Sequence, residues 1–134
     1  MQATTLHHPK ETLLIVDDEP LMTDLFQQMM SRHGYRVIAA HNGQEALTLV
    51  EKGECPVHLV IMDMTMPGMN GLETAQALQN RAPSIPILIA TGLAADLDTA
   101  TLPTNVMGLI QKPYYSRILL EQIRAILDTT EATA

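Results

Sequence analysis

Residues 59–71 read LVIMDMTMPGMNG: an unbroken apolar run ends in one carboxylate, Asp63, and a Pro-Gly turn follows soon after it. Such a run is typical of a strand that is buried on both faces and lies centrally in a parallel sheet. A carboxylate at the C-terminal end of that strand lies at the edge where open α/β sheets bind their ligands. Asp63 is therefore the first candidate for a functional residue.

A second apolar run leads to the same edge of the predicted sheet. Residues 13–16, Leu-Leu-Ile-Val, run directly into Asp17, Asp18 and Glu19. Carboxylates that gather at one sheet edge repel one another, and a hard divalent cation offsets this repulsion. The two strand ends together predict a divalent cation site.

Composition limits the kind of protein that this chain can be. Its 134 residues suit one domain with a core of its own, and 46% of them are hydrophobic. The formal net charge of −7 comes from 15 acidic residues against 8 basic ones, which argues against direct binding to nucleic acid. The single cysteine, Cys55, has no partner for an internal disulfide.

No apolar run in the sequence is long enough to cross a bilayer, so we expect no membrane insertion. The polar residues 1–11 also lack the apolar centre of a signal peptide, which favours a place in the cytoplasm. We predict a polar extension over residues 1–11, a folded domain over 12–127 and a disordered tail over 128–134.

Strand and helix signals alternate along the folded part. Apolar residues at helical spacing follow Pro20, and the capping patterns that start at Asn42 and Asn70 begin two further helices. The predicted strands are 13–16, 36–39, 59–62, 86–90 and 106–110, and the predicted helices are 20–33, 42–50, 70–80 and 116–127. This alternation implies right-handed crossovers and an α/β fold with a doubly wound parallel sheet.

The helix expected between the fourth and fifth strands is the weak element of this pattern. Only residues 94–102 carry a helical signal there, and Pro103 ends it. We therefore predict that this fourth helix is short or irregular.

Four short motifs, each at the end of a predicted strand, carry a resemblance to a known family. They are VDDEP at 16–20, MDMTMPGMNG at 62–71, ATG at 90–92 and QKPY at 111–114. In this order they resemble the receiver domain of response regulators in two-component signalling, over residues 12–127. The resemblance implies a flavodoxin-like (βα)5 fold with the strand order 2-1-3-4-5.

The resemblance also implies that Asp63 is the phosphoacceptor of a switch that phosphorylation activates. The donor would be a phosphohistidine on a histidine kinase or a histidine phosphotransfer protein. A carboxylate takes up a phosphoryl group as an acyl phosphate, and because both groups are negative the attack needs positive charge close by. Lys112 and Thr91 would contact the phosphoryl oxygens, and conformational output would pass through their loops.

Magnesium is the cofactor that this resemblance implies. Asp18 would bind the ion directly and Asp17 mainly through water, while Asp63 and the backbone carbonyl of Thr65 would supply further ligands. The Lys112–Pro113 bond is a candidate cis peptide.

One departure from the family concerns the fifth strand. Receivers commonly carry an aromatic residue or histidine near its end, and by spacing from Lys112 that position here is Leu109. Together with the weak fourth helix, this leads us to the hypothesis that output uses another face, or that the domain is a phosphate relay or sink. We expect a monomer or a weak dimer.

Three further classes of function compete with a receiver. A flavin-binding flavodoxin-like domain would have a Ser/Thr/Gly-rich phosphate loop after its first strand, where this chain has Asp17, Asp18 and Glu19. An aspartate-nucleophile phosphatase needs a second aspartate two residues after its nucleophile, where this chain has Thr65. A phosphate-independent pseudo-receiver would lack one of the acidic residues or the lysine, and none is missing. A receiver catalyses its own phosphotransfer and dephosphorylation, so we do not expect turnover on a separate substrate. Whether the domain stands alone or belongs to a hybrid kinase stays open.

Overall fold

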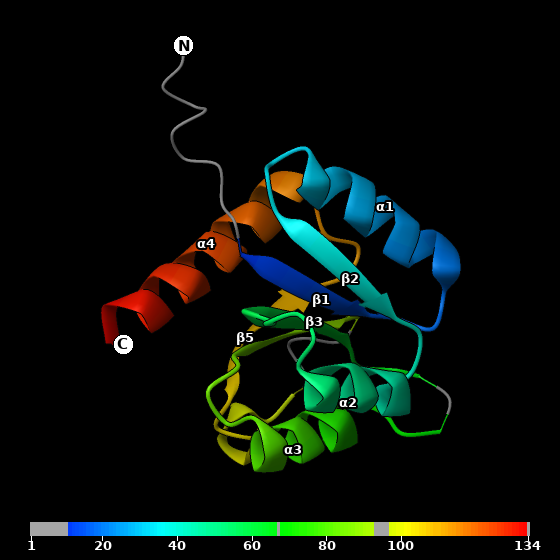
Figure 1. Cartoon of the computed structure of the whole chain (residues 1–134), viewed down its shortest axis with the longest axis vertical. Coiled ribbons are helices and arrows are strands. Elements are labelled where there is room, and N and C mark those ends of the chain that lie inside the picture. Colours follow the sequence, from blue (N-terminus) through cyan, green and yellow to red (C-terminus); the bar gives the residue numbers. More distant parts are fainter. Residues whose placement is uncertain (1–10, 67, 93–96, 134) are drawn as a thin grey trace.

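A computed structural model describes residues 11–66, 68–92 and 97–133, and in this part of the chain one parallel sheet of five strands lies between two layers of helices (Figure 1). The order is β2-β1-β3-β4-β5, which confirms the expected topology. The strands are β1 (Thr12–Val16), β2 (Arg36–Ala40), β3 (Leu59–Asp63), β4 (Ile87–Thr91) and β5 (Val106–Gln111).

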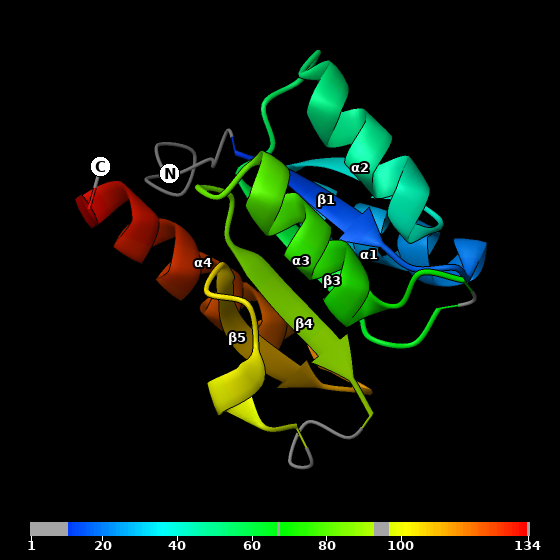
Figure 2. The same cartoon turned by 90° about the horizontal axis from the view of Figure 1, so that it is seen from below.

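Four α-helices in the described residues cover the sheet, two on each face (Figures 1 and 2). They are α1 (Pro20–Ser31), α2 (Gly43–Lys52), α3 (Gly71–Arg81) and α4 (Ser116–Thr133). α1 and α4 build one core layer around Phe26 and Leu119, and α2 and α3 build the other around Leu47 and Leu78. Strands β1, β3 and β4 are buried at every position, as their continuous apolar runs predict.

The ends of two helices follow from local sequence signals. At the start of α3, Asn70 accepts a hydrogen bond from the backbone N–H of Glu73 while the Glu73 carboxylate accepts one from the backbone N–H of Asn70, each at 2.9 Å. This reciprocal capping confirms the predicted helix start. α1 ends at Ser31, two residues before the predicted end, because Gly34 adopts a φ of 90° and turns the chain into β2.

The last helix is longer than predicted. We expected it to end at Leu127, but α4 continues through Thr133. Polar side chains sustain the extra turns: Arg124 donates to Asp128 at 2.9 Å, and the hydroxyl of Thr130 donates to the carbonyl of Ile126, also at 2.9 Å. We expected a disordered tail over residues 128–134, whereas the Arg124–Asp128 pair at positions i and i+4 favours continuation of the helix.

The segment between β4 and β5 agrees with the expected irregularity as far as the structure describes it. Residues 93–96 of the predicted helix lie outside the described residues, as do residues 1–10 of the predicted extension and residue 134 of the tail. From Leu97 onward the regular structure before β5 is a single 3₁₀ turn, Thr99–Thr101.

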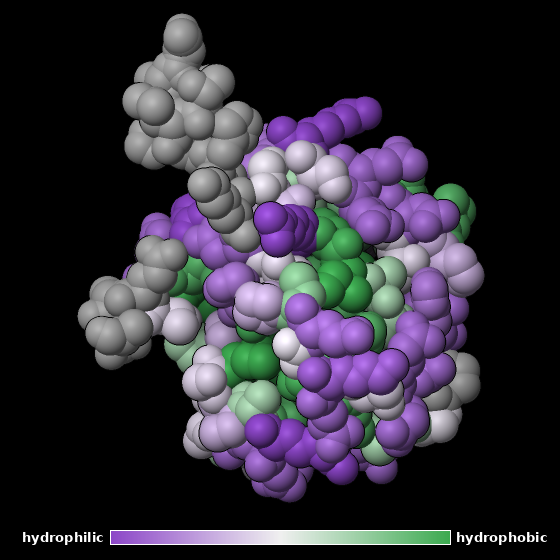
Figure 3. All heavy atoms as spheres, viewed as in Figure 1, coloured by the Kyte–Doolittle hydropathy of each residue, from purple (hydrophilic) through white to green (hydrophobic). Residues whose placement is uncertain are grey.

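Hydrophilic residues cover most of the face seen in Figure 3, with hydrophobic residues visible in smaller areas between them. Among the residues that the structure describes, no helix combines the length and the apolar character needed to span a membrane.

Candidate functional site

The carboxyl ends of β1 and β3 bring three aspartates together. One carboxylate oxygen each from Asp17, Asp18 and Asp63 can be chosen so that all three lie within 4.8 Å of one another. Asp17 and Asp63 are buried, with 2% and 7% of their surface exposed, whereas Asp18 faces solvent. We expected these carboxylates at one sheet edge, and they lie there because β1 and β3 are parallel neighbours.

Asp63 is held in place by the chain segment that follows it. The backbone N–H of Met64 donates to the carbonyl of Ala90 on β4, and the N–H of Gly71 donates to the carbonyl of Met64, both at 3.0 Å. A β-carbon on Gly71 would lie 2.5 Å from the carbonyl oxygen of Asp63, so only glycine permits this close approach. The loop that contains Thr65 is thereby folded back against the end of β3.

Lys112 brings positive charge to the cluster from the end of β5, the edge strand of the sheet. Its amino group donates to a carboxylate oxygen of Asp63 at 2.9 Å and to one of Asp17 at 3.4 Å. The backbone N–H of Lys112 donates to the carbonyl of Thr91 at 2.8 Å, so the end of β5 stays in register with the end of β4. The Lys112–Pro113 bond is cis, as we expected for this candidate.

The charges of this cluster are incompletely balanced. Burial raises the pKa of the Asp63 carboxyl, and Lys112 and a backbone hydrogen bond from Thr65 only partly counter that effect. Burial alone would lower the pKa of Lys112, but its hydrogen bond to Asp63 and the charges of Asp17 and Asp63 together raise it. The Lys112 ammonium thus pairs with two of the three clustered carboxylates, and this set of hard oxygen donors fits a divalent cation such as Mg²⁺.

Thr91 ends β4 next to this cluster. In the register of the sheet, Ala90 pairs with Asp63 and Thr91 pairs with Gln111. Thr91 is buried, with 6% of its surface exposed. The structure therefore gathers Asp17, Asp63, Thr91 and Lys112 at one edge from four different strands or their ends, and the roles given to them stay predictions.

Gln111 contacts the ends of both β4 and β5, a role that we did not predict from the sequence. Its side-chain amide donates to two backbone carbonyls, that of Gly92 at 2.6 Å and that of Lys112 at 3.0 Å. No local sequence pattern predicts these bonds, because the bond to Gly92 joins residues that are 19 positions apart, at the ends of neighbouring strands.

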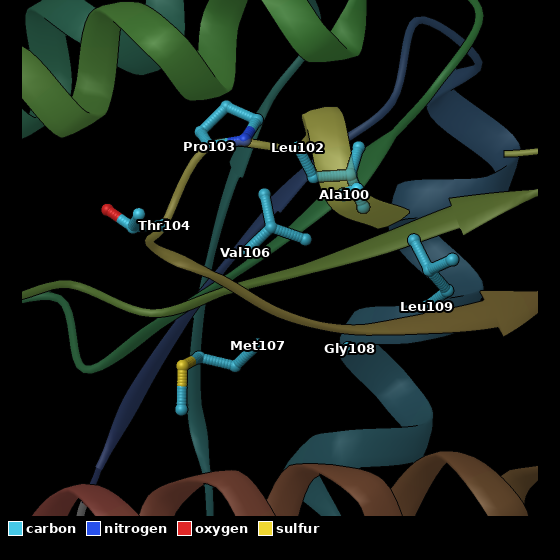
Figure 4. Close-up of a pocket in the computed structure, with 8 residues that line it drawn as sticks. All are labelled: Ala100, Leu102, Pro103, Thr104, Val106, Met107, Gly108 and Leu109. Atoms are coloured by element: carbon cyan, nitrogen blue, oxygen red, sulfur yellow. The ribbon is translucent and has the colours of Figure 1, made fainter. Parts of the chain in front are cut away.

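A surface hollow lies along β5 and the segment before it, and Figure 4 shows the residues that line it. It has a volume of about 580 Å³, and its lining includes Leu102, Val106 and Leu109, along the side of β5. Leu109 is partly buried and packs against the core layer of α2 and α3. The hollow holds none of the predicted site residues, so its size does not make it the candidate site.

Comparisons with known proteins agree with this geometry. The family model described as response regulator receiver domain matches residues 13–124. The transcriptional regulatory protein CpxR of Escherichia coli K12 is 33% identical over 116 residues, which cover 86% of this chain and 48% of that protein. The probable transcriptional regulator ycf27 of Pyropia yezoensis is 34% identical over 123 residues, covering 91% and 49%. The chain spans about half the length of these relatives.

Solved structures give the same result. A CheY-like receiver domain protein from Methanospirillum hungatei superimposes with a TM-score of 0.84 at 29% identity, covering 94% of this chain and 100% of the other. The response regulator TrrA from Thermotoga maritima, solved in complex with Mg²⁺ and beryllofluoride, gives a TM-score of 0.75 at 29% identity, covering 86% and 97%.

Proposed function

The chain belongs to the response regulator receiver family, and on that premise we propose that Asp63 accepts a phosphoryl group from a phosphohistidine on a histidine kinase or a histidine phosphotransfer protein, in a Mg²⁺-dependent reaction. The observation that carries this proposal is the cluster of Asp17, Asp18 and Asp63 with the Lys112 amino group 2.9 Å from Asp63. Paired carboxylates and one cation at the end of a parallel sheet suit phosphoryl transfer to an aspartate.

In this proposal an oxygen of the Asp63 carboxylate attacks phosphorus while the phosphorus–nitrogen bond of the phosphohistidine breaks, and its electron pair returns to the donor's imidazole. Asp17, Asp18, Asp63 and the backbone carbonyl of Thr65 would hold Mg²⁺, which when bound offsets the negative charge between the reacting groups. Lys112 stays protonated because its pKa is raised, and so it remains available to pair with the phosphoryl oxygens.

The same site would return to its starting state by hydrolysis. Water attacks the phosphorus of the acyl phosphate, the phosphorus–oxygen bond to Asp63 breaks, and inorganic phosphate leaves. The domain would thus catalyse its own phosphorylation and dephosphorylation without turning over a separate substrate. Output would follow from the new contacts of Thr91 and Lys112 with the phosphoryl group, which bias the loops that carry them.

The other functions weighed from the sequence fit less well. The phosphatase alternative needs an aspartate where Thr65 stands, and the pseudo-receiver alternative needs a defect in an acidic cluster that is complete. The family match favours neither of them. The absence of direct nucleic-acid binding by these residues, the cytoplasmic location and the monomeric or weakly dimeric state stay predictions from the sequence.

A protein donor is supported by apolar side chains that solvent reaches beside the site. Leu21 and Leu25 on α1 and Tyr115 just before α4 are at least half exposed. Leu25 and Ser116 line one shallow hollow, which places α1 next to the start of α4. Exposed apolar groups at this place suit the surface of a partner protein that must bring its histidine to Asp63.

Phosphorylation by acetyl phosphate tests the proposal. The wild-type protein and Asp63→Asn are incubated with the donor, with and without Mg²⁺, and resolved on a phosphate-affinity gel. We expect a shifted band only for the wild type and only with Mg²⁺. Asp24→Asn, which removes an exposed carboxylate of α1, is the matched control and should behave as wild type. A shifted band of equal intensity from Asp63→Asn would refute the assignment.

A donor protein that carries phosphohistidine extends the same experiment. Transfer from it to the wild type, and none to Asp63→Asn, is the result expected for a receiver. A folded wild-type protein that accepts phosphate from neither donor would contradict the proposal and favour a phosphate-independent binding module.

A further inference from the structure

Two residues that the proposed function places on the phosphoryl group come from different strands. Thr91 ends β4, and Lys112 follows β5 directly. The sheet ladder joins the two chain segments up to the hydrogen bond from the Lys112 N–H to the Thr91 carbonyl, at 2.8 Å. Beyond that bond the segments leave the sheet, so their spacing there depends on other contacts.

The side chain of Gln111 supplies such a contact. It spans the gap between the two segments, donating one N–H to the carbonyl of Gly92 at 2.6 Å and the other to the carbonyl of Lys112 at 3.0 Å. The first carbonyl belongs to the residue after Thr91, and the second belongs to Lys112 itself. An amide with two donors is the chemical group that can hold two carbonyls at once.

We infer that Gln111 is a positioning residue, which sets the spacing of Thr91 and Lys112 so that both can contact the phosphoryl group that Asp63 receives. This inference rests on the proposed function, because it concerns the same reaction. Hydrogen bonds that hold reacting or binding groups in place beforehand raise affinity by reducing the ordering that binding requires. The two hydrogen bonds of Gln111 reach the carbonyl of Gly92, next to Thr91, and the carbonyl of Lys112, so Gln111 would act through these two segments.

The position of Gln111 should make it affect the binding of a phosphoryl mimic but not the binding of Mg²⁺ alone. The carboxylates of Asp17, Asp18 and Asp63 come from β1, β3 and the residues after them, whereas Gln111 links β4 to β5. Loss of the Gln111 amide should therefore leave the affinity for Mg²⁺ alone unchanged and weaken the binding of a phosphoryl mimic. A residue with a merely structural role would change both affinities or neither.

Calorimetric titrations of Gln111→Met with Mg²⁺ alone, and then with beryllofluoride at saturating Mg²⁺, test this inference. Methionine keeps the length of the side chain and removes both donors. We expect an unchanged affinity for Mg²⁺ and an affinity for beryllofluoride about fivefold lower than that of the wild type, the size expected for the loss of one ordinary hydrogen bond, because only the bond to Gly92 joins the two segments. The rate of phosphorylation by acetyl phosphate should fall by a similar factor.

Gln27→Met is the matched control. Gln27 also donates its side-chain amide to a backbone carbonyl, that of Val37 at 3.2 Å, and it is also exposed. This bond joins α1 to β2 and touches no residue of the site. The control should therefore bind Mg²⁺ and beryllofluoride as the wild type does, while a thermal melt shows whether the two variants lose similar stability.

The possible failures are distinguishable. A Gln111→Met variant with the wild-type affinity for beryllofluoride would overturn the inference and leave the proposed function intact. A variant that loses affinity for Mg²⁺ as much as for beryllofluoride would do the same. A wild-type protein that binds Mg²⁺ but no beryllofluoride would overturn the proposed function, and this inference with it.

Discussion

The amino group of Lys112 lies 2.9 Å from a carboxylate oxygen of Asp63, although the two residues are 49 positions apart in the sequence. The same amino group lies 3.4 Å from Asp17. Lys112 therefore stands where the proposed reaction needs positive charge, and it also competes with a cation for oxygens of two carboxylates. Lys112 should therefore strengthen the binding of a phosphoryl group and weaken the binding of Mg²⁺, and the two affinities can be measured separately.

Replacement of Lys112 by Met should reveal both effects. Without the ammonium the three carboxylates repel one another more strongly, so the affinity for Mg²⁺ should be equal to or higher than that of the wild type. The affinity for beryllofluoride should fall at least about tenfold, because a charge-assisted hydrogen bond is lost. Calorimetry measures both constants, and Lys52→Met, at an exposed lysine of α2, is the control. A large loss of Mg²⁺ affinity in Lys112→Met would contradict this account.

The stability of Asp63→Asn should depend on pH in a defined direction. Burial raises the pKa of Asp63 above 3.8, so the folded protein binds this proton more tightly than the unfolded chain. Above the folded pKa the charged carboxylate therefore costs folding free energy, and below 3.8 it does not. Without Mg²⁺, Asp63→Asn should melt at a higher temperature than the wild type at pH 7, and the difference should shrink as the pH falls through the folded pKa. Circular dichroism melts test this, and a lower melting temperature at pH 7 would contradict it.

Gly71 should tolerate no side chain. The β-carbon of alanine would lie 2.5 Å from the carbonyl oxygen of Asp63 and 2.9 Å from the α-carbon of Met64, and both are backbone atoms. Gly71→Ala should therefore lower the free energy of unfolding by roughly 1–3 kcal/mol and slow phosphorylation of Asp63. Urea denaturation and the phosphorylation assay measure the two effects. Gly92→Ala is the control for the unfolding measurement alone, since no described atom lies within 4 Å of its added β-carbon.

The apolar surface beside the site should matter for a protein donor alone. Leu25→Asp places a charge on a half-exposed position of α1 that we expect the partner to cover. Phosphotransfer from a phosphohistidine protein should slow at least about tenfold, while phosphorylation by acetyl phosphate stays at the wild-type rate. Met107→Asp, at another exposed apolar residue, on β5, is the control and should transfer normally. Equal slowing with both donors would mean that Leu25 acts on the fold.

Local signals were sufficient for most of the fold. The apolar runs of β1 and β3 marked strands buried on both faces, and the capping pattern at Asn70 marked the start of α3, because each depends on residues that are near one another in sequence. The prediction was wrong for the end of α4, where contacts between neighbouring turns of the helix outweigh polar composition. The hydrogen bonds of Gln111 had no local signal.

The sequence by itself determined the order of strands and helices and placed Asp17, Asp18 and Asp63 at strand ends, because hydrophobic periodicity and turn residues are properties of short segments. Only the tertiary structure decided which groups meet there. The contact of Lys112 with Asp63 and the bridge of Gln111 to Gly92 depend on the register of β5 beside β4 and on the closeness of parallel strand ends. The pKa of Asp63 depends likewise on burial by segments remote in sequence, so no local pattern encodes it.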